Sequence, residues 1–213
     1  MHNFANVPDL AAMKRLPQPF RMIAVVQAMS TVKRFCLVPC HVNQSIGDHT
    51  GRSVMLAFLV AEEFGLSMEE TLDLAKRMAF HDSHETITSD IPYPVKHMTS
   101  DLAEAISDAE SDVEGVIFEG YQMPFRGCPI LPKSRFLSCV VDMLDLVLFC
   151  ANELAMHNIH HMEILRKGLK VLETYNEGYE RIYQFNMFNQ VNTVSAIYHM
   201  ASDLLQKVDN ALI

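Results

Sequence analysis

The sequence contains no tryptophan, no surplus of basic residues and no apolar run that approaches the ~20 residues of a membrane-spanning helix. The N-terminus also lacks the basic, apolar and small-residue order of a secretory signal, so we expect a cytoplasmic protein without a membrane segment. Lysine and arginine number 17 against 26 acidic residues, which gives a net charge of −9. Without cations to neutralise a phosphate backbone, a nucleic acid polymer is not an expected partner, whereas a small phosphorylated ligand stays compatible.

Strand-like alternation and internal repeats are missing as well, whereas apolar residues recur at helical spacing along most of the chain. Hydrophobic residues make up 49% of the 213 residues, which is enough to form a core. We therefore expect an all-α bundle of about six or seven helices, with residues 1–18 as an N-terminal extension and residues 19–213 as one domain. The spacing predicts helices at 20–33, 48–64, 68–84, 99–118, 134–155, 159–183 and 187–210.

Local signals set several of the expected helix ends. Asp48 is a candidate N-cap, Gly65 stands where a helix would end, and Ser67 with Glu70 forms a capping-box pattern. The predicted helix 99–118 turns its apolar residues inward, and its acids are most simply explained as a solvated face. These acids are Asp101, Glu104, Asp108, Glu110, Asp112 and Glu114.

Histidines and aspartates occur in a pattern that packing alone does not explain. His81 and Asp82 stand together at the end of a predicted buried helix, His49 lies in the first turn of another, and Asp142 lies in an almost continuously apolar helix. Two imidazoles and two carboxylates from three core helices suit one divalent transition-metal ion, such as Co, Mn, Zn, Fe or Ni. The alternative is that His49 is a surface residue and Asp142 a buried acid with a hydrogen-bond partner.

Two further acids follow the His-Asp pair. If the helix continues through Glu85, this carboxylate shares a face with His81, where it can orient a water molecule or a ligand histidine. Asp90 lies just beyond, before the Pro92-x-Pro94 turn. The alternatives are a solvated acid at the helix end for Glu85 and an Asx-type turn for Asp90.

A phosphate-binding role is expected for Arg34, because a guanidinium group in a loop can fork two phosphate oxygens. The adjacent Phe35 can pack on a sugar or a base. The alternative is that Arg34 only completes the C-terminus of the preceding helix. Lys96, near the Pro-x-Pro turn, is a second candidate cation.

Cysteine and the remaining histidines give weaker signals. Cys36, Cys40 and His41 lack a second ligand pair at the spacing of a zinc site, so we expect reduced structural thiols. The three histidines of segment 157–161 have no carboxylate support in the sequence, and we do not expect them to bind a metal.

The order H…HD…D in an all-α chain resembles the HD-domain metal-dependent phosphohydrolases. The sequence FHDSHETITSDIPYPVKH is similar to a more specific motif, that of the YfbR-like 5′-deoxynucleotidases, in which an acid, a TGD-like triplet and Pro-x-Pro-x-Lys follow the HD pair. The spacing from Arg34 to His49 fits the same family, as does the helix VVDMLDLVLFCANEL with Asp142 rather than Asp145 in register. The similarity extends over residues 20–160.

The resemblance implies a homo-oligomeric HD-domain enzyme that releases a deoxynucleoside from a deoxynucleotide. It is either a 5′-deoxynucleotidase or, as in a related phage branch, a dATP triphosphohydrolase. In bacterial members a tryptophan that helps to exclude a 2′-hydroxyl stands where this chain has Phe35, so sugar and base preference stay open. The alternatives are a phosphodiesterase acting on cyclic or oligonucleotides and a non-catalytic nucleotide-binding module. The implied roles are metal ligation by His49, His81, Asp82 and Asp142, acid–base or phosphate-side chemistry by Glu85 and Asp90, and phosphate binding by Arg34.

Overall fold

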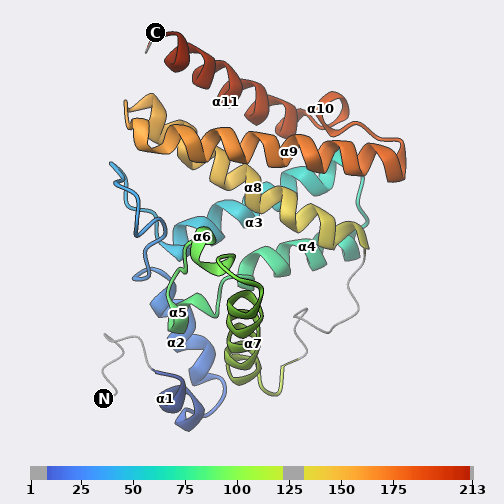
Figure 1. Ribbon diagram of the computed structural model, residues 1–213. Coiled ribbons are helices and arrows are strands. Elements are labelled where there is room, and N and C mark those ends of the chain that lie inside the picture. Colours follow the sequence, from blue (N-terminus) through green and yellow to red (C-terminus); the bar gives the residue numbers. More distant parts are fainter. Residues whose placement is uncertain (1–8, 122–131, 212–213) are drawn as a thin grey trace. The chain divides into compact units, whose positions relative to one another are not determined.

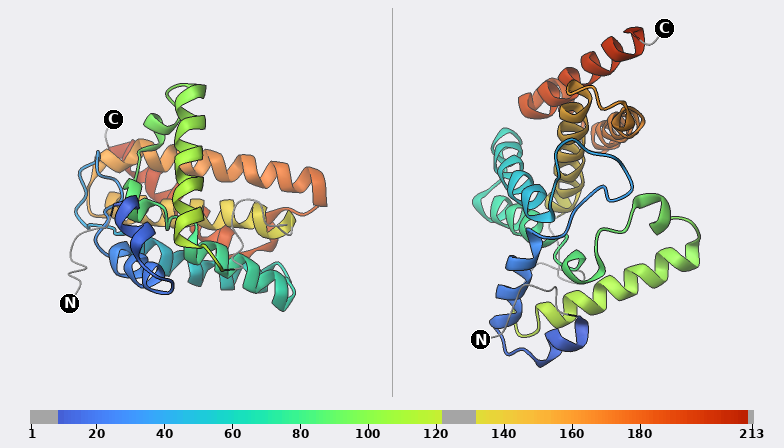
Figure 2. Two further views of the ribbon diagram at one scale, coloured as in Figure 1. Left: turned by 90° about the horizontal axis from the view of Figure 1, so that it is seen from below. Right: turned by 90° about the vertical axis from the view of Figure 1, so that its left-hand side faces the viewer.

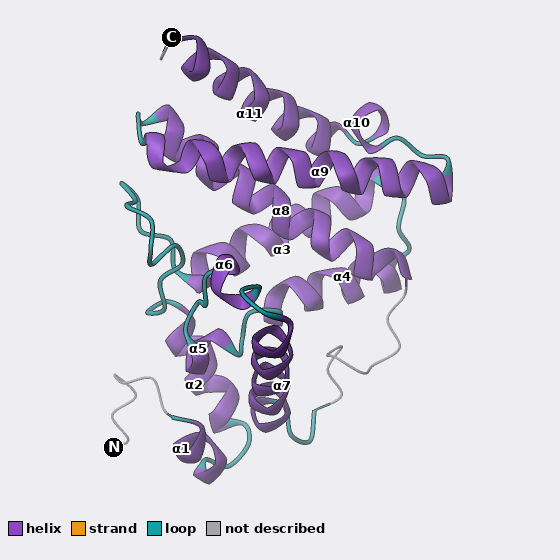
Figure 3. Ribbon diagram, in the orientation of Figure 1, coloured by secondary structure: helices purple, strands orange, loops and turns teal. Residues whose placement is uncertain are grey.

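The protein is all-α in the computed structural model, which describes residues 9–121 and 132–211. Over these residues Figure 3 shows helices joined by loops, and one isolated antiparallel bridge joins Lys33 and Ser45. Seven helices of ten or more residues agree with the predicted six or seven, and four shorter α-helices and a 3-10 helix add to them. No helix among the described residues combines the length and the apolar character needed to cross a membrane. The elements are α1 (Leu10–Arg15), α2 (Phe20–Met29), α3 (Ile46–Glu63), α4 (Met68–Phe80), α5 (Glu85–Thr88), α6 (Tyr93–Lys96), α7 (Ser100–Ile117), α8 (Pro132–Ala155), η1 (Ile159–His161), α9 (Met162–Tyr183), α10 (Met187–Gln190) and α11 (Asn192–Ala211).

The chain divides into two compact units, and each is described by itself. The boundary runs through α3 after Thr50 and falls at the end of α4 before Phe80. Of the described residues, unit 1 contains 9–37, 43–50 and 80–121, and unit 2 contains 38–42, 51–79 and 132–211.

The core of unit 1 forms where α1, α2 and the first turn of α3 meet α7 (Figure 1). Helix α1 lies inside the segment that we expected to be an extension, and its Met13 is completely buried in this core. The burial of these side chains removes apolar surface from water and holds the four elements together. The cluster contains Met13, Ala24, Val25, Met29, Val32, Ile46, Val113, Ile117 and Phe118.

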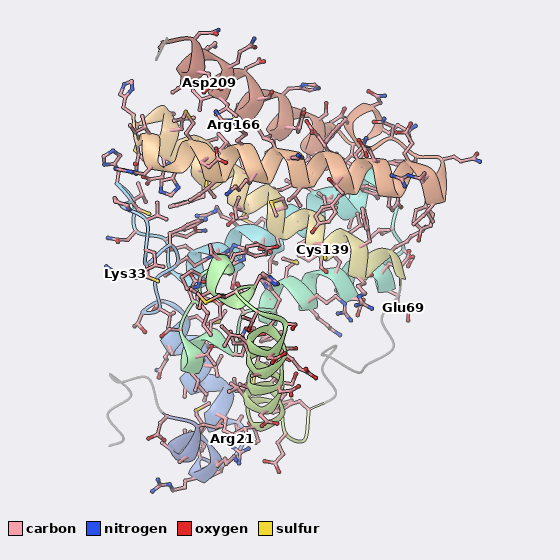
Figure 4. All side chains as sticks on the ribbon, viewed as in Figure 1. Arg21, Lys33, Glu69, Cys139, Arg166 and Asp209 are labelled. Carbon is pink, nitrogen blue, oxygen red and sulfur yellow. The ribbon has the colours of Figure 1, made fainter. Side chains whose placement is uncertain are left out.

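A buried arginine joins three elements of unit 1. Arg21 of α2, labelled in Figure 4, donates from Nε to the carbonyl of Leu16 at 2.8 Å and from Nη1 to the carbonyl of Val116 at 2.8 Å. Its Nη1 also lies 2.5 Å from Glu119 Oε2. A cation is favourable beside the last carbonyls of α7 because the C-terminal end of a helix dipole is negative. Arg21 therefore ties α1 and α2 to the end of α7.

Helix α8 is the centre of unit 2, and α9 and α11 pack against it (Figures 1 and 2). Arg166 of α9 forms an ion pair with Asp209 of α11 at 2.9 Å on the surface (Figure 4). Because α8 is covered by two helices, it is apolar over most of its circumference. Its completely buried residues include Leu137, Val140, Val141, Leu144 and Val147.

One acid of this apolar helix is neutralised within unit 2. The carboxylate of Asp145 is completely buried, and Arg52 of α3 contacts both of its oxygens. Arg52 Nε lies 2.5 Å from Oδ1, and Nη2 lies 3.2 Å from Oδ2. This bidentate geometry supplies the partner that a charged group in an apolar helix requires.

Several predicted helix ends are confirmed, and one is corrected. Ser67 N donates to Glu70 Oε2 at 2.8 Å and Glu70 N donates to Ser67 Oγ at 3.2 Å, which is the predicted capping box. Gly65 ends α3 with a φ of 64°, as a glycine C′ residue does. The prediction of Asp48 as the N-cap is wrong. Ser45 Oγ accepts from the Asp48 N–H at 3.1 Å, so Ser45 is the cap and Asp48 is the third residue of a second capping box.

Two glycines of α9 should respond to substitution in opposite ways. A Cβ at Gly168 would lie 3.0 Å from Leu146 Cδ2 and 3.1 Å from Val147 Cγ2, whereas at Gly178 it meets no described atom of another element within 4 Å. We expect Gly168→Val to lower the free energy of unfolding by about 1–3 kcal/mol through overpacking against α8. We expect Gly178→Ala to raise it by about 0.5–1 kcal/mol because alanine is the better helix former. Urea denaturation measures both changes, and equal stabilities would contradict the close packing at Gly168.

Candidate active site

Two imidazoles and one carboxylate converge in unit 1. His49 Nε2 lies 3.0 Å from His81 Nε2. Asp82 Oδ2 lies 3.4 Å from His49 Nε2 and 3.3 Å from His81 Nε2. His49 is completely buried, whereas His81 and Asp82 are half-buried. We call these three side chains the His-His-Asp group.

The His-His-Asp group forms at the break between α4 and α5. Helix α4 ends at Phe80, earlier than predicted, and the Ser83 N–H donates to the Phe80 carbonyl at 3.0 Å in the turn that follows. Adjacent residues of an α-helix point about 100° apart. His81 and Asp82 stand in the turn instead, where both side chains reach His49 of the neighbouring helix start.

The spacing of the three donor atoms fits a metal ion. Ligands bound tetrahedrally at about 2.0–2.1 Å from an ion lie roughly 3.4 Å from one another. The three pairs of donor atoms here are separated by 3.0, 3.4 and 3.3 Å. Imidazole and carboxylate ligands together suit zinc and related divalent transition ions, so the residues fit the cofactor class predicted from the sequence.

The fourth predicted ligand, Asp142, lies on α8 in unit 2 and is half-buried. The neighbouring acid of the same helix, Asp145, is engaged by Arg52. The two aspartates of α8 therefore have different surroundings, although the sequence shows them only three residues apart.

The loop after α2 brings Arg34 to the His-His-Asp group. Arg34 N donates to the Gln44 carbonyl at 2.9 Å, and Ile46 N donates to the Val32 carbonyl at 2.9 Å, so the two ends of the loop are paired. Arg34 Nη1 lies 3.4 Å from Asp82 Oδ2. The guanidinium group is thus beside the candidate metal ligands rather than only at the end of α2.

Phe35 and Asp90 hold each other in place. Phe35 has a φ of 57°, a left-handed conformation that is costly for a large side chain, and its N–H donates to Asp90 Oδ2 at 3.0 Å. The Arg34 guanidinium carbon lies 5.9 Å from the centre of the Phe35 ring. The Asp90 carboxylate therefore fixes the backbone that carries both side chains.

Glu85 is buried at the start of α5, with 6% of its surface exposed. The expectation that it shares a helical face with His81 is wrong, because α4 ends before both residues. Burial raises the pKa of Glu85 to about 8, and the negative charges of Asp82 and Asp90 add to this effect. Its Oε2 is buried and has no hydrogen-bond partner among the described residues. Such a carboxyl group is neutral at pH 7 and can donate a proton.

Lys96 lies between Glu85 and an acid of α7. Its Nζ is 3.0 Å from Glu110 Oε1 and 3.7 Å from Glu85 Oε1. Burial disfavours the charged ammonium group, but the hydrogen bond to Glu110 and the charge of Glu85 outweigh this effect and raise the pKa of Lys96. The second candidate cation is therefore held in unit 1, in contact with Glu85.

Sequence reasoning missed three buried residues, His84, Glu110 and Glu114, of which Glu110 contacts this lysine. The prediction that the acids of α7 form a solvated face is wrong for two of them, because Glu110 and Glu114 are only 6% and 7% exposed. The available signal was the position of Glu110, four residues after Ile106 and three before Val113, within the apolar stripe of the helix. The prediction holds for the exposed acids Asp101, Glu104, Asp108 and Asp112.

A buried histidine of unit 2 contacts two thiols. His161 is completely buried, with Cys40 Sγ 3.4 Å from Nε2 and Cys150 Sγ 3.5 Å from Nδ1. Burial lowers the pKa of His161. Because the two sulfurs approach different ring nitrogens, these contacts do not assemble ligands for one ion. Cys128 lies outside the described residues.

Comparison with known proteins finds a relative by sequence and several solved structures of similar fold. A 5′-deoxynucleotidase of Vibrio vulnificus is 25% identical to this chain over 185 residues, which covers 80% of the chain and 93% of the relative. The HD phosphohydrolase DatZ of cyanophage S-2L, solved with dA and one catalytic Zn²⁺ ion, aligns with a TM-score of 0.55 at 18% identity over 90% of this chain and 98% of its own. An HD-domain phosphohydrolase of Listeria innocua aligns with a TM-score of 0.63 at 17% identity over 88% of this chain and 98% of its own.

The all-α fold is shared with the HD-domain phosphohydrolases of cyanophage S-2L and Listeria innocua. The sequence profile described as "5′-deoxynucleotidase YfbR-like" matches residues 21–191, which is most of the chain. The chain therefore belongs to the YfbR-like family, as the motif in residues 80–97 indicated.

Proposed function

We propose that this enzyme hydrolyses the 5′-phosphate ester of a deoxynucleotide and releases the deoxynucleoside, with a divalent transition-metal ion as cofactor. The observation that carries the proposal is Glu85. It is a buried carboxyl group with a pKa raised to about 8, and the His-His-Asp group and two cations belong to the same unit. A proton donor, candidate metal ligands and phosphate-binding cations are the parts that phosphate ester hydrolysis needs.

The metal would be held by His49, His81 and Asp82, and we assign the fourth protein ligand to Asp142. The ion pair of Asp145 with Arg52 supports the choice between the two aspartates of α8. A divalent ion in such a site acts as a Lewis acid on the phosphoryl group and lowers the pKa of the attacking water.

The remaining side chains bind the substrate and move a proton. Arg34 and Lys96 neutralise phosphate oxygens, and the ring of Phe35 packs against the sugar or the base. Glu85 gives its proton to the 5′-oxygen of the leaving deoxynucleoside, which would otherwise depart as an alkoxide. Asp90 keeps the loop of Arg34 and Phe35 in the orientation that this binding requires.

The first candidate substrate is a deoxynucleoside 5′-monophosphate, because the Vibrio relative is a 5′-deoxynucleotidase. The second is dATP with release of the whole triphosphate, and the binding of dA by the cyanophage phosphohydrolase supports it. We also propose a homo-oligomer, because α3 exposes the apolar side chains of Met55, Phe58 and Leu59 on one face.

A substrate panel tests the proposal. The purified protein with Co, Mn or Zn is incubated with the deoxynucleoside mono- and triphosphates, and the products are identified by chromatography. We expect the deoxynucleoside together with phosphate from a monophosphate, or together with triphosphate from dATP. A cyclic dinucleotide and a short oligonucleotide control for the phosphodiesterase alternative. Absence of product from every deoxynucleotide with every metal would sink the proposal.

A further inference from the structure

A row of buried charges extends from α7 toward Glu85 within unit 1. Glu110 and Glu114 lie one helical turn apart on α7, and the ring of His84 lies between their carboxylates. His84 Nδ1 is 3.1 Å from Glu114 Oε1, and Nε2 is 3.4 Å from Glu110 Oε1. Lys96 Nζ is 3.0 Å from the same oxygen of Glu110.

Acidic and basic side chains alternate along this row, because the two ring nitrogens of His84 face Glu114 and Glu110 and the ammonium group of Lys96 faces Glu110. The hydrogen bond from His84 lowers the pKa of Glu110, with a further contribution from Lys96. From Glu114 through His84 and Glu110 to Lys96, each acidic side chain therefore has a basic neighbour that stabilises it.

Within this row, Glu110 is the residue that contacts Lys96. A lysine carries a compact charge on a flexible four-carbon stem, so its ammonium group has no fixed place without a partner. The side chain of Lys96 is 26% exposed, whereas the side chain of Glu110 is 8% exposed and contacts His84 on its other side. The buried carboxylate is thus the fixed member of the pair, and it keeps the ammonium group 3.7 Å from Glu85 Oε1.

We propose that Glu110 is a positioning residue of the phosphate site, which holds the Lys96 ammonium group beside Glu85 while His84 and Glu114 hold Glu110. The inference rests on the proposed function, because it gives Lys96 the task of binding a phosphate oxygen. Glu110 itself contacts Lys96 and not the substrate. Replacement of Glu110 should therefore change phosphate binding only through Lys96, and a double-mutant cycle can measure this dependence.

The test is a double-mutant cycle on Glu110→Gln and Lys96→Met, with inorganic phosphate as the binding probe in calorimetry on the metal-loaded protein. We expect each single variant to weaken phosphate binding and to lower kcat/KM about 10- to 100-fold, the usual effect of losing one contact with a charged group. The double variant should be no weaker than Lys96→Met alone, because Glu110 has nothing left to position. Glu104→Gln, an exposed acid on the same helix, should bind phosphate like the wild type.

The outcomes separate this inference from the proposed function. Losses that multiply in the double variant, or unchanged phosphate affinity in Glu110→Gln, would overturn the positioning role even in an active enzyme. If the wild type binds phosphate and the cycle is non-additive, but no deoxynucleotide is hydrolysed, the positioning role stands and the proposed function fails. A wild type that does not bind phosphate overturns the inference whatever it hydrolyses. Thermal unfolding and metal content of each variant show whether the fold and the metal site are retained. If Glu110→Gln does not fold, Lys96→Met, at a partly exposed position, still measures how much phosphate binding depends on the lysine.

Discussion

Asp82→Asn is expected to lower kcat/KM by about 10³-fold or more and to release the metal. The Oδ2 atom of Asp82 lies 3.4 Å from Nε2 of His49 and 3.3 Å from Nε2 of His81, and Arg34 Nη1 lies 3.4 Å away on another side. Asparagine keeps the size of the side chain but loses the negative charge that a divalent ion requires. The measurements are kcat/KM on the best substrate of the panel and metal content after gel filtration.

The matched control is Asp108→Asn, which removes one charge from an exposed position of α7. We expect this variant to retain both metal and activity, so that a general effect of net charge is excluded. If Asp82→Asn binds the metal as tightly as the wild type, the His-His-Asp group does not hold the ion. If it loses the metal but keeps its activity, the reaction does not use the metal.

Glu85→Gln is expected to lower kcat by about 10²–10⁴-fold, the usual contribution of a general acid. Glutamine fills the same buried space but cannot give up a proton to the leaving 5′-oxygen. The effect on KM should be smaller, because proton donation occurs in the transition state and not in substrate binding. Glu69→Gln on α4 is the control, because Glu69 is exposed.

The dependence of kcat on pH shows whether Glu85 acts as a general acid or as a general base. Burial raises the pKa of Glu85 from 4.5 to about 8, so the proton-donating form predominates below that pH. We expect wild-type kcat to fall about tenfold per pH unit as the pH rises beyond the pKa of Glu85. A divalent cation next to Asp82 offsets part of the negative charge there, which places the midpoint at pH 8 or below. Glu85→Gln should lack this limb. If the limb persists in the variant, another group titrates, and if kcat instead rises through this range, Glu85 is a base.

Local chemistry explains why part of the structure could be read directly from the sequence. Ser67 and Glu70 form their capping box from residues within one helical turn, and Gly65 ends α3 through its own backbone freedom. Hydrophobic spacing likewise located the seven long helices. Cap residues were less certain where two candidates compete, as with Ser45 and Asp48, because both side chains can reach the same N–H groups.

The His-Asp stretch from which the site was recognised gave residue types but not their arrangement. The predicted helix 68–84 contains His81 and Asp82, and it would include Glu85 only if it continued, whereas α4 ends at Phe80 and the pair stands in a turn. The difference matters chemically. The turn allows His81 and Asp82 to meet His49, while Glu85 begins a new short helix and becomes buried.

By itself the sequence determined the helical class of this protein, most helix ends and the residue types of a metal-dependent phosphohydrolase, because these depend on neighbours within a turn or two or on a recognisable motif. Only the tertiary structure decided which acids are buried and what neutralises them. Asp145 pairs with Arg52 from a helix far away in the sequence, and Glu110 and Glu114 enclose His84, a residue that no pattern singled out. The physical reason is that the state of a charged side chain depends on the elements packed against it, and helical periodicity carries no information about which elements those are.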